Sequence, residues 1–129
     1  MPVTYSNPPG VRAPASRYSH AALMEGPGRR LVISGQVGFT PEGEVSASGE
    51  EQIRQCLRNL EVVLGAHGMC LGHVVKMTCF LTDTSLIPQW RHLREAAFGS
   101  HACTSTLLVI SALADPRFVV EVEAEAFDG

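Results

Sequence analysis

The sequence is poor in charged and aromatic side chains, and it lacks the short motifs that indicate several common chemistries. Of its 129 residues, 18% are charged and 6% are aromatic, with ten Lys and Arg against thirteen Asp and Glu. Nucleic-acid binders need a basic patch interleaved with aromatics, which this composition does not provide. There is also no G-x-S-x-G elbow, no dinucleotide fingerprint and no Gly-rich phosphate loop. We therefore expect no nucleic-acid partner.

Long apolar runs are absent as well. No stretch approaches the roughly 20 apolar residues that a membrane-spanning helix needs. The first fifteen residues contain four prolines in place of the apolar core of a signal peptide. These absences predict a cytoplasmic protein with no membrane partner.

Metal-ligand spacing is missing too. The cysteines form no C-x-x-C pair and the five histidines no H-x-x-x-H pair. In a chain without a secretion signal, such cysteines are expected to be reduced and buried as small apolar side chains. We therefore predict no metal. The cysteines concerned are Cys56, Cys70, Cys79 and Cys103.

The apolar content is high by comparison. Apolar residues make up 45% of the chain, enough for one modest core in a single domain spanning residues 1–129. Residues 1–16 are predicted to be an extended, Pro-rich N-terminal segment. So many apolar residues beside so few charges also suggest that the domain does not cover all of its apolar surface alone.

Two helices are predicted. Ser48 and Glu51 form a capping box, and apolar residues at helical spacing follow it until the glycines at 65 and 68. The polar face of this helix is assigned to Gln52, Arg54, Gln55, Arg58 and Asn59. The second helix covers residues 85–98, and its inward positions are Leu86, Trp90, Leu93 and Ala97.

Strands are predicted at residues 18–24 and 30–36, joined by a Gly/Pro turn, and at residues 74–82. A final hairpin is expected from residues 106–111 and 118–127. The order β-β-α-β-α-β-β predicts an α+β fold with a mixed sheet, because helical crossovers join parallel strands and place both helices on one face. The other face carries apolar residues with nothing in the chain to cover them, which favours a partner subunit.

Three features suggest chemistry, each with a simpler alternative. Glu121, Glu123 and Glu125 share one face of the last strand, either as a solvated surface or with one carboxylate acting as an acid or base in a cleft. Ser34-Gly35 ends a strand, where the glycine either forms a bulge or lets a ligand approach the backbone. His101 and Cys103 are neighbours without an orienting third group, so a catalytic dyad is not favoured.

Several segments together resemble the RidA (YjgF, endoribonuclease L-PSP) family. The resemblance runs from about residue 17 to residue 127 and implies a chorismate-mutase-like fold, assembled as a homotrimer with a small-molecule cleft at each subunit interface. It also implies cofactor-free hydrolysis of reactive enamines and imines such as 2-aminoacrylate. The segments are Tyr18–Ala21, Leu31–Val37, Gln55–Leu60, Val74–Asp83 and Val119–Ala124.

The resemblance also assigns residues to the cleft. Tyr18, Ser34, Gly35 and Glu121 match its cleft-lining Tyr, Ser, Gly and acid, with Glu121 and Tyr18 in the catalytic roles. Ser105, however, stands where the family has an Arg that clamps the substrate carboxylate.

A serine supplies neither the charge nor the planar fork of that arginine. Another cation would therefore have to bind a carboxylate, and the candidates are Arg91, otherwise a surface residue of the second helix, and Arg17. Two functions follow from the substitution: a hydrolase whose substrate differs from 2-aminoacrylate, or a non-catalytic trimer that binds or senses a small ligand.

Overall fold

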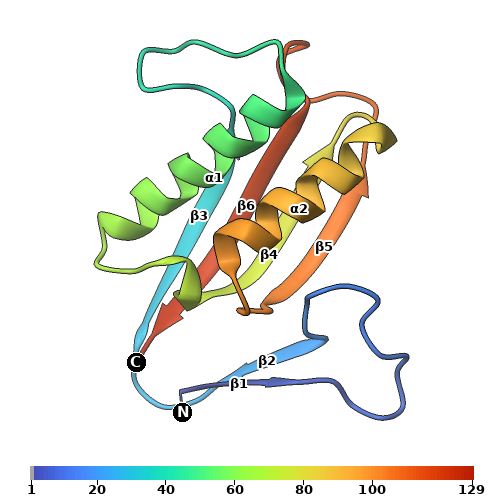
Figure 1. Cartoon of the computed structure of the whole chain (residues 1–129). Helices are drawn as coiled ribbons and strands as arrows, with labels where there is room; N and C mark the ends of the chain where they lie inside the picture. Colours follow the sequence, from blue (N-terminus) through green and yellow to red (C-terminus); the bar gives the residue numbers. More distant parts are fainter. Residues whose placement is uncertain (1) are drawn as a thin grey trace.

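The computed structural model describes residues 2–129 and shows a four-stranded sheet with two helices on one of its faces (Figure 1). A separate two-stranded sheet lies at one end of this body. The strands are β1 (Val3–Ser6), β2 (Ala21–Met24), β3 (Arg29–Val37), β4 (Val74–Leu81), β5 (Thr104–Val109) and β6 (Val120–Asp128). The helices are α1 (Gly49–Gly65) and α2 (Ile87–Phe98), with short 3-10 turns at Leu71–His73 and Thr84–Leu86.

The main sheet has the strand order β3-β6-β4-β5. Strand β6 is antiparallel to both of its neighbours, whereas β4 and β5 run parallel and are joined by α2. The predicted α+β class, mixed sheet and one-sided helices are therefore confirmed. None of the helices within residues 2–129 combines the length and the apolar character needed to cross a membrane.

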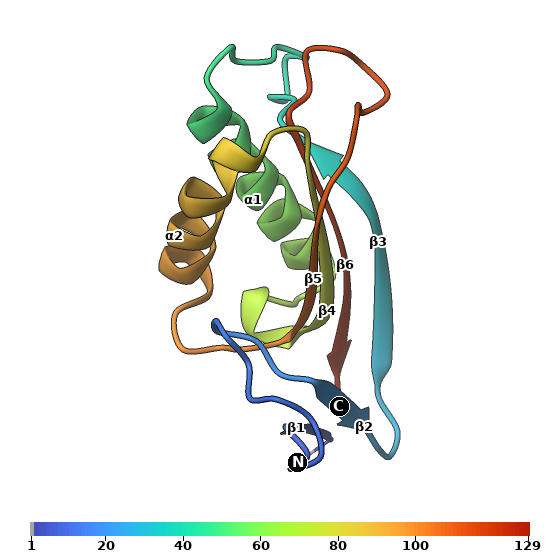
Figure 2. The same cartoon turned by 90° about the vertical axis from the view of Figure 1, so that its right-hand side faces the viewer.

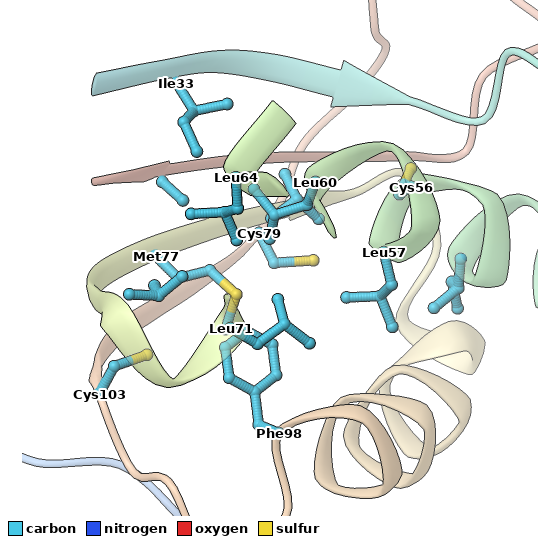
Figure 3. Packing of buried hydrophobic residues seen from close by; sticks show 14 of the residues in the cluster. Ile33, Cys56, Leu57, Leu60, Leu64, Leu71, Met77, Cys79, Phe98 and Cys103 are labelled. Atoms are coloured by element: carbon cyan, nitrogen blue, oxygen red, sulfur yellow. The ribbon is translucent and has the colours of Figure 1, made fainter. Parts of the chain in front are cut away.

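The first helix begins where the capping residue predicts. The Ser48 hydroxyl accepts a hydrogen bond from the backbone N–H of Glu51, which satisfies one of the free donors of the first turn. The apolar stripe of α1 then packs with α2 over the buried side chains of β4 and β6 (Figure 3). Fully buried members of this core include Leu60, Leu64 and Trp90.

The predicted final hairpin is wrong, and the two strands joined by the Gly/Pro turn do not pair with each other either. Strands β2 and β3 are consecutive, but β2 pairs with β1 in the small sheet while β3 joins the main sheet. Strands β5 and β6 are not partners either, because β4 lies between them. Strand pairing depends on contacts far apart in the sequence, whereas the prediction relied on adjacency along the chain.

The N-terminal segment contains a strand that the prediction lacks. Strand β1 falls within the segment predicted to be only extended, and Tyr18, expected to open the next strand, precedes β2. The Tyr5 hydroxyl donates to the carbonyl of Val74 at 3.1 Å, and the same carbonyl accepts from the His101 ring at 2.7 Å. Burial of Tyr5 raises its pKa to about 12. These contacts attach the small sheet to the main body.

Gln52 is not on the exposed face of α1 as predicted. Its side chain is 1% exposed and bonds three backbone groups in two loops. Its Nε2 donates to the carbonyls of Ser46 and Arg117, both at 2.8 Å, and its Oε1 accepts from the N–H of Val119 at 3.0 Å. One amide thus connects the loop before α1 to the segment that leads into β6.

We predict that Gln52→Leu destabilises the protein by about 2–4 kcal/mol, because it leaves one partly buried backbone donor and two acceptors without their partner. Urea unfolding followed by circular dichroism measures this cost. The matched control is Gln55→Leu on the same helix, which is expected to change stability by less than about 0.5 kcal/mol. An equal loss in both variants would contradict the role given to Gln52.

Candidate active site

The face of the sheet opposite the helices is left uncovered (Figure 2). Strand register places Glu121 on this open face between Val37 of β3 and Phe80 of β4, with Leu108 of β5 next in the row. Several apolar side chains stay exposed here, including Val32 at 64% and Leu108 at 44%. The open face therefore combines a carboxylate with an apolar surface.

Gly35 lies directly against Glu121. The register of β3 and β6 shifts here, so that Ser34 and Gly35 together oppose the single residue Glu123. A Cβ added to Gly35 would overlap Oε2 of Glu121 and lie 2.7 Å from its Cδ. The interpretation of this glycine as a bulge is therefore correct, and the close neighbour that the bulge admits is the Glu121 carboxylate. The approach of a ligand to this backbone stays a prediction.

Two other carboxylates of β6 line a neighbouring hollow of about 100 Å³ on the open face, together with Lys76 and Thr78. Glu125 is paired with Arg30 at 2.9 Å, while Glu123 is exposed. The three glutamates thus have different surroundings. Only Glu121 rests on the glycine bulge.

A second hollow lies where residues 18–20 run beside the start of β5. Ser19 joins this edge through its N–H to the Cys103 carbonyl at 3.1 Å and its hydroxyl to the Ala102 carbonyl at 2.6 Å. The hollow has a volume of about 180 Å³, and its lining includes Tyr18, His20, Lys76 and residues 104–106. The structure thus places Tyr18 with the β5 edge and not with Glu121.

Ser105 does not share the face of Glu121. It pairs with Met77, which is 1% exposed beneath the helices, so its side chain lies on the helix-covered side. Thr104 and Thr106 occupy the open face of β5 instead. A clamp directed to the open face would have to come from one of these two positions, and neither carries a charge.

The two arginines proposed from the sequence lie apart from Glu121. Arg91 is exposed on α2, and Arg17 is exposed and donates to the Gly99 carbonyl at 2.6 Å. Arg94 is not among the residues predicted from the sequence, although it is 7% exposed and lines a small space with Arg17 and Ser105. Helical spacing was the available signal, because Arg94 follows the inward-facing Trp90 by four residues.

The cysteines do not form a nucleophilic site in the described chain. Cys56, Cys79 and Cys103 are buried, and Cys70 is exposed, contrary to the prediction. Burial raises the pKa of Cys103 to about 11 and that of Cys56 to about 12, so neither is a thiolate at neutral pH. Nor do residues 2–129 contain a cluster of three or more metal-ligating side chains.

Glu121 and the β5 edge hollow are too far apart for one small ligand. Glu121 opposes Phe80, whereas Thr104 opposes Lys76, four residues earlier on β4. At about 3.3 Å per residue this separation is about 13 Å along the strands, and β5 and β6 are a further ~10 Å apart across β4. One chain therefore holds these two groups of candidate residues in separate places.

Comparisons with known proteins agree with this fold. The chain is 30% identical to the human 2-iminobutanoate/2-iminopropanoate deaminase over 129 residues, covering 98% of this chain and 89% of that protein. It is 35% identical to the Escherichia coli enzyme of the same name over 78 residues, covering 60% of this chain and 61% of the relative. The matched segment thus spans only about three fifths of some curated relatives.

The structural match is more extensive. The crystal structure of a conserved Rid-family protein, YyfB from Yersinia pestis, superimposes with a TM-score of 0.88 at 26% identity and covers 98% of both chains. The family model described as endoribonuclease L-PSP matches residues 10–127, which is nearly the whole chain. The chain therefore belongs to the RidA (endoribonuclease L-PSP) family.

Proposed function

We propose that the protein is a cofactor-free hydrolase that deaminates a small imine or enamine. The observation that carries the proposal is the Glu121 carboxylate held against the Gly35 bulge on the open face. The names of the relatives, 2-iminobutanoate/2-iminopropanoate deaminase, support the reaction class. The resemblance of Tyr18, Ser34, Gly35 and Glu121 to the cleft-lining residues of the RidA family supports this location for the active site.

The chemistry requires one group that can move protons. Water adds across the C=N bond, and the resulting carbinolamine collapses to a carbonyl compound and ammonia. A carboxylate beside the reacting carbon takes a proton from the water and returns it to the departing nitrogen. Glu121 is the group we assign to this step, because the bulge leaves its carboxylate at the surface of the face.

The proposed cleft lies between two copies of the chain. Glu121 and the hollow containing Tyr18 are separate in one chain, so a second copy would bring one of each together. The exposed apolar side chains of the open face, Val32 and Leu108 among them, support burial by such a copy. We propose that the protein is a homotrimer. Light scattering should then give a particle mass of about three times the chain mass of 13.9 kDa.

The substrate is proposed to differ from 2-aminoacrylate. No arginine lies on the open face of β5, where Thr104 and Thr106 stand. A ligand held as in the family archetype would lose a charge-assisted clamp, which costs about 2–5 kcal/mol of carboxylate binding. A substrate of different shape, or one bound through another cation, fits this arrangement better.

Ammonia release from freshly generated imines tests the proposal. The panel includes 2-iminobutanoate, 2-iminopropanoate and neutral imines, each measured with and without the protein. We expect at least one substrate to release ammonia faster than the reaction without protein. If none does, while small ligands still raise the melting temperature, the protein is a binding module and the hydrolase proposal is wrong.

A further inference from the structure

Arg94 is a buried cation for which the fold supplies no partner. It lies on the inner side of α2, is 7% exposed, and its Nη2 has no hydrogen-bond acceptor within residues 2–129. The five ion pairs found in this range do not include it. Burial accordingly lowers the pKa of its guanidinium. A buried charge without a partner is strongly unfavourable, which points to an occupant that the chain itself does not provide.

The surroundings of Arg94 suit an anion. It borders a space of about 10 Å³ together with Arg17, Ser105, His101 and Glu95. The lining thus includes two arginines, a serine and a histidine against one glutamate, and the rest of it is Met77, Phe98 and Cys103. Arg17 is exposed and donates through Nη1 to the Gly99 carbonyl, whereas the buried Nη2 of Arg94 has no acceptor within residues 2–129.

The size of the space limits what can enter. A volume of about 10 Å³ is close to that of one water-sized probe, so it admits one oxygen atom and not a whole phosphate. Met77 and Ser105 also line the hollow of about 180 Å³ at the β5 edge. A ligand in that larger hollow would have to place one oxygen beside Ser105 to reach Arg94.

We propose that Arg94 is the carboxylate-binding residue of this protein, with one carboxylate oxygen in the small space beside Ser105. The inference rests on the proposed function for the rest of the cleft, but the carboxylate site itself follows from the orphaned guanidinium and the two spaces. Arg94 then supplies from the helix the charge that β5 lacks.

The other cations near the hollows are poorer candidates. Arg91 is exposed on α2, so a ligand bound there would compete with water. Lys76 shares its open-face hollow with Glu123 and Glu125, which offset its charge. Among these described cations, Arg94 is the one that is buried, has a donor without a partner and lines a space.

The test uses 2-oxobutanoate, the acid formed when 2-iminobutanoate loses ammonia, with butanone as its counterpart lacking the carboxylate. Isothermal titration with the assembled wild-type protein is expected to show binding of the acid and little binding of the ketone. Arg94→Met should weaken binding of the acid by about 30-fold or more, because a charge-assisted clamp is lost. It should also raise the melting temperature by about 3–10 °C, since Met removes an unpaired buried charge.

Two further variants complete the test. Arg58→Met, an exposed arginine on α1, is the matched control and should change neither binding nor melting temperature. Arg91→Met tests the competing cation. The proposal is overturned if Arg94→Met binds 2-oxobutanoate as tightly as the wild type, or if Arg91→Met loses the binding instead.

A water molecule is the remaining occupant. If the wild type binds 2-oxobutanoate no better than butanone and Arg94→Met only raises the melting temperature, the space holds water and the carboxylate site is wrong. Because 2-oxobutanoate is not turned over, this measurement does not depend on catalysis. Failure of the hydrolase proposal would therefore leave Arg94-dependent binding intact, and failure of the Arg94 proposal would leave ammonia release intact.

Discussion

Glu121→Gln is expected to reduce ammonia release by about 10²–10⁴-fold, the usual contribution of a positioned acid or base. Glutamine keeps the size and hydrogen-bonding capacity of the side chain but cannot accept and return the proton. The Gly35 bulge can still accommodate it, so the fold and the assembly should be unchanged. Steady-state ammonia release measures the effect, and light scattering checks the assembly.

Glu123→Gln is the matched control, because it changes a carboxylate on the same strand and the same face two residues away. Glu123 is exposed and opposes the bulge without lying in it. We expect this variant to keep most of its activity. Full turnover in Glu121→Gln, or equal losses in both variants, would show that another group moves the proton.

Gly35→Ala is expected to lower turnover by about 10²-fold or more with a smaller effect on stability. The added methyl group overlaps the Glu121 carboxylate, the far end of a flexible side chain, so the side chain can move aside while the backbone stays in place. A displacement of about 1 Å at a reacting group is enough to cost about 10²-fold in rate. Ammonia release and thermal unfolding, measured on the same preparation, separate the two effects.

Gly65→Ala is the control, because it adds the same methyl group at a glycine where the group contacts no other atom. A Cβ at Gly65, the last residue of α1, has no neighbour within 4 Å. This variant should keep its activity and gain about 0.4–1 kcal/mol of stability, because alanine loses less entropy on folding. If Gly35→Ala keeps full activity, the position of the Glu121 carboxylate does not matter for turnover.

Local signals predicted the parts of the fold that depend on neighbouring residues. The Ser48 cap and the apolar spacing located α1, and the alternation along β6 placed Glu121 on the face opposite Val122 and Val120. These features follow from helical and strand periodicity within one segment. The resemblance to the RidA family added the residues of the candidate site.

Features that depend on contacts between residues far apart in the sequence were not predicted. The position of Gln52 in the helical pattern predicts that it lies on the polar face of α1. Its amide is nevertheless buried, because it forms hydrogen bonds with backbone groups of two loops that are distant in the sequence. Ser105 was assigned one position away from the residues that face outward, and in a strand a shift of one residue exchanges the two faces. The burial of Arg94 could not be predicted, because it depends on how α2 packs on β5.

The central position of β6 has a consequence for how the protein is made. It lies between β3 and β4, yet it is the last strand of the sheet to leave the ribosome. Until residues 120–128 are synthesised, β3 and β4 lack the strand that joins them, and their facing edges stay open. Sheet closure therefore waits for the C-terminal strand, so the pairing that completes the core and the placement of Glu121 occur in one late, non-local step of folding.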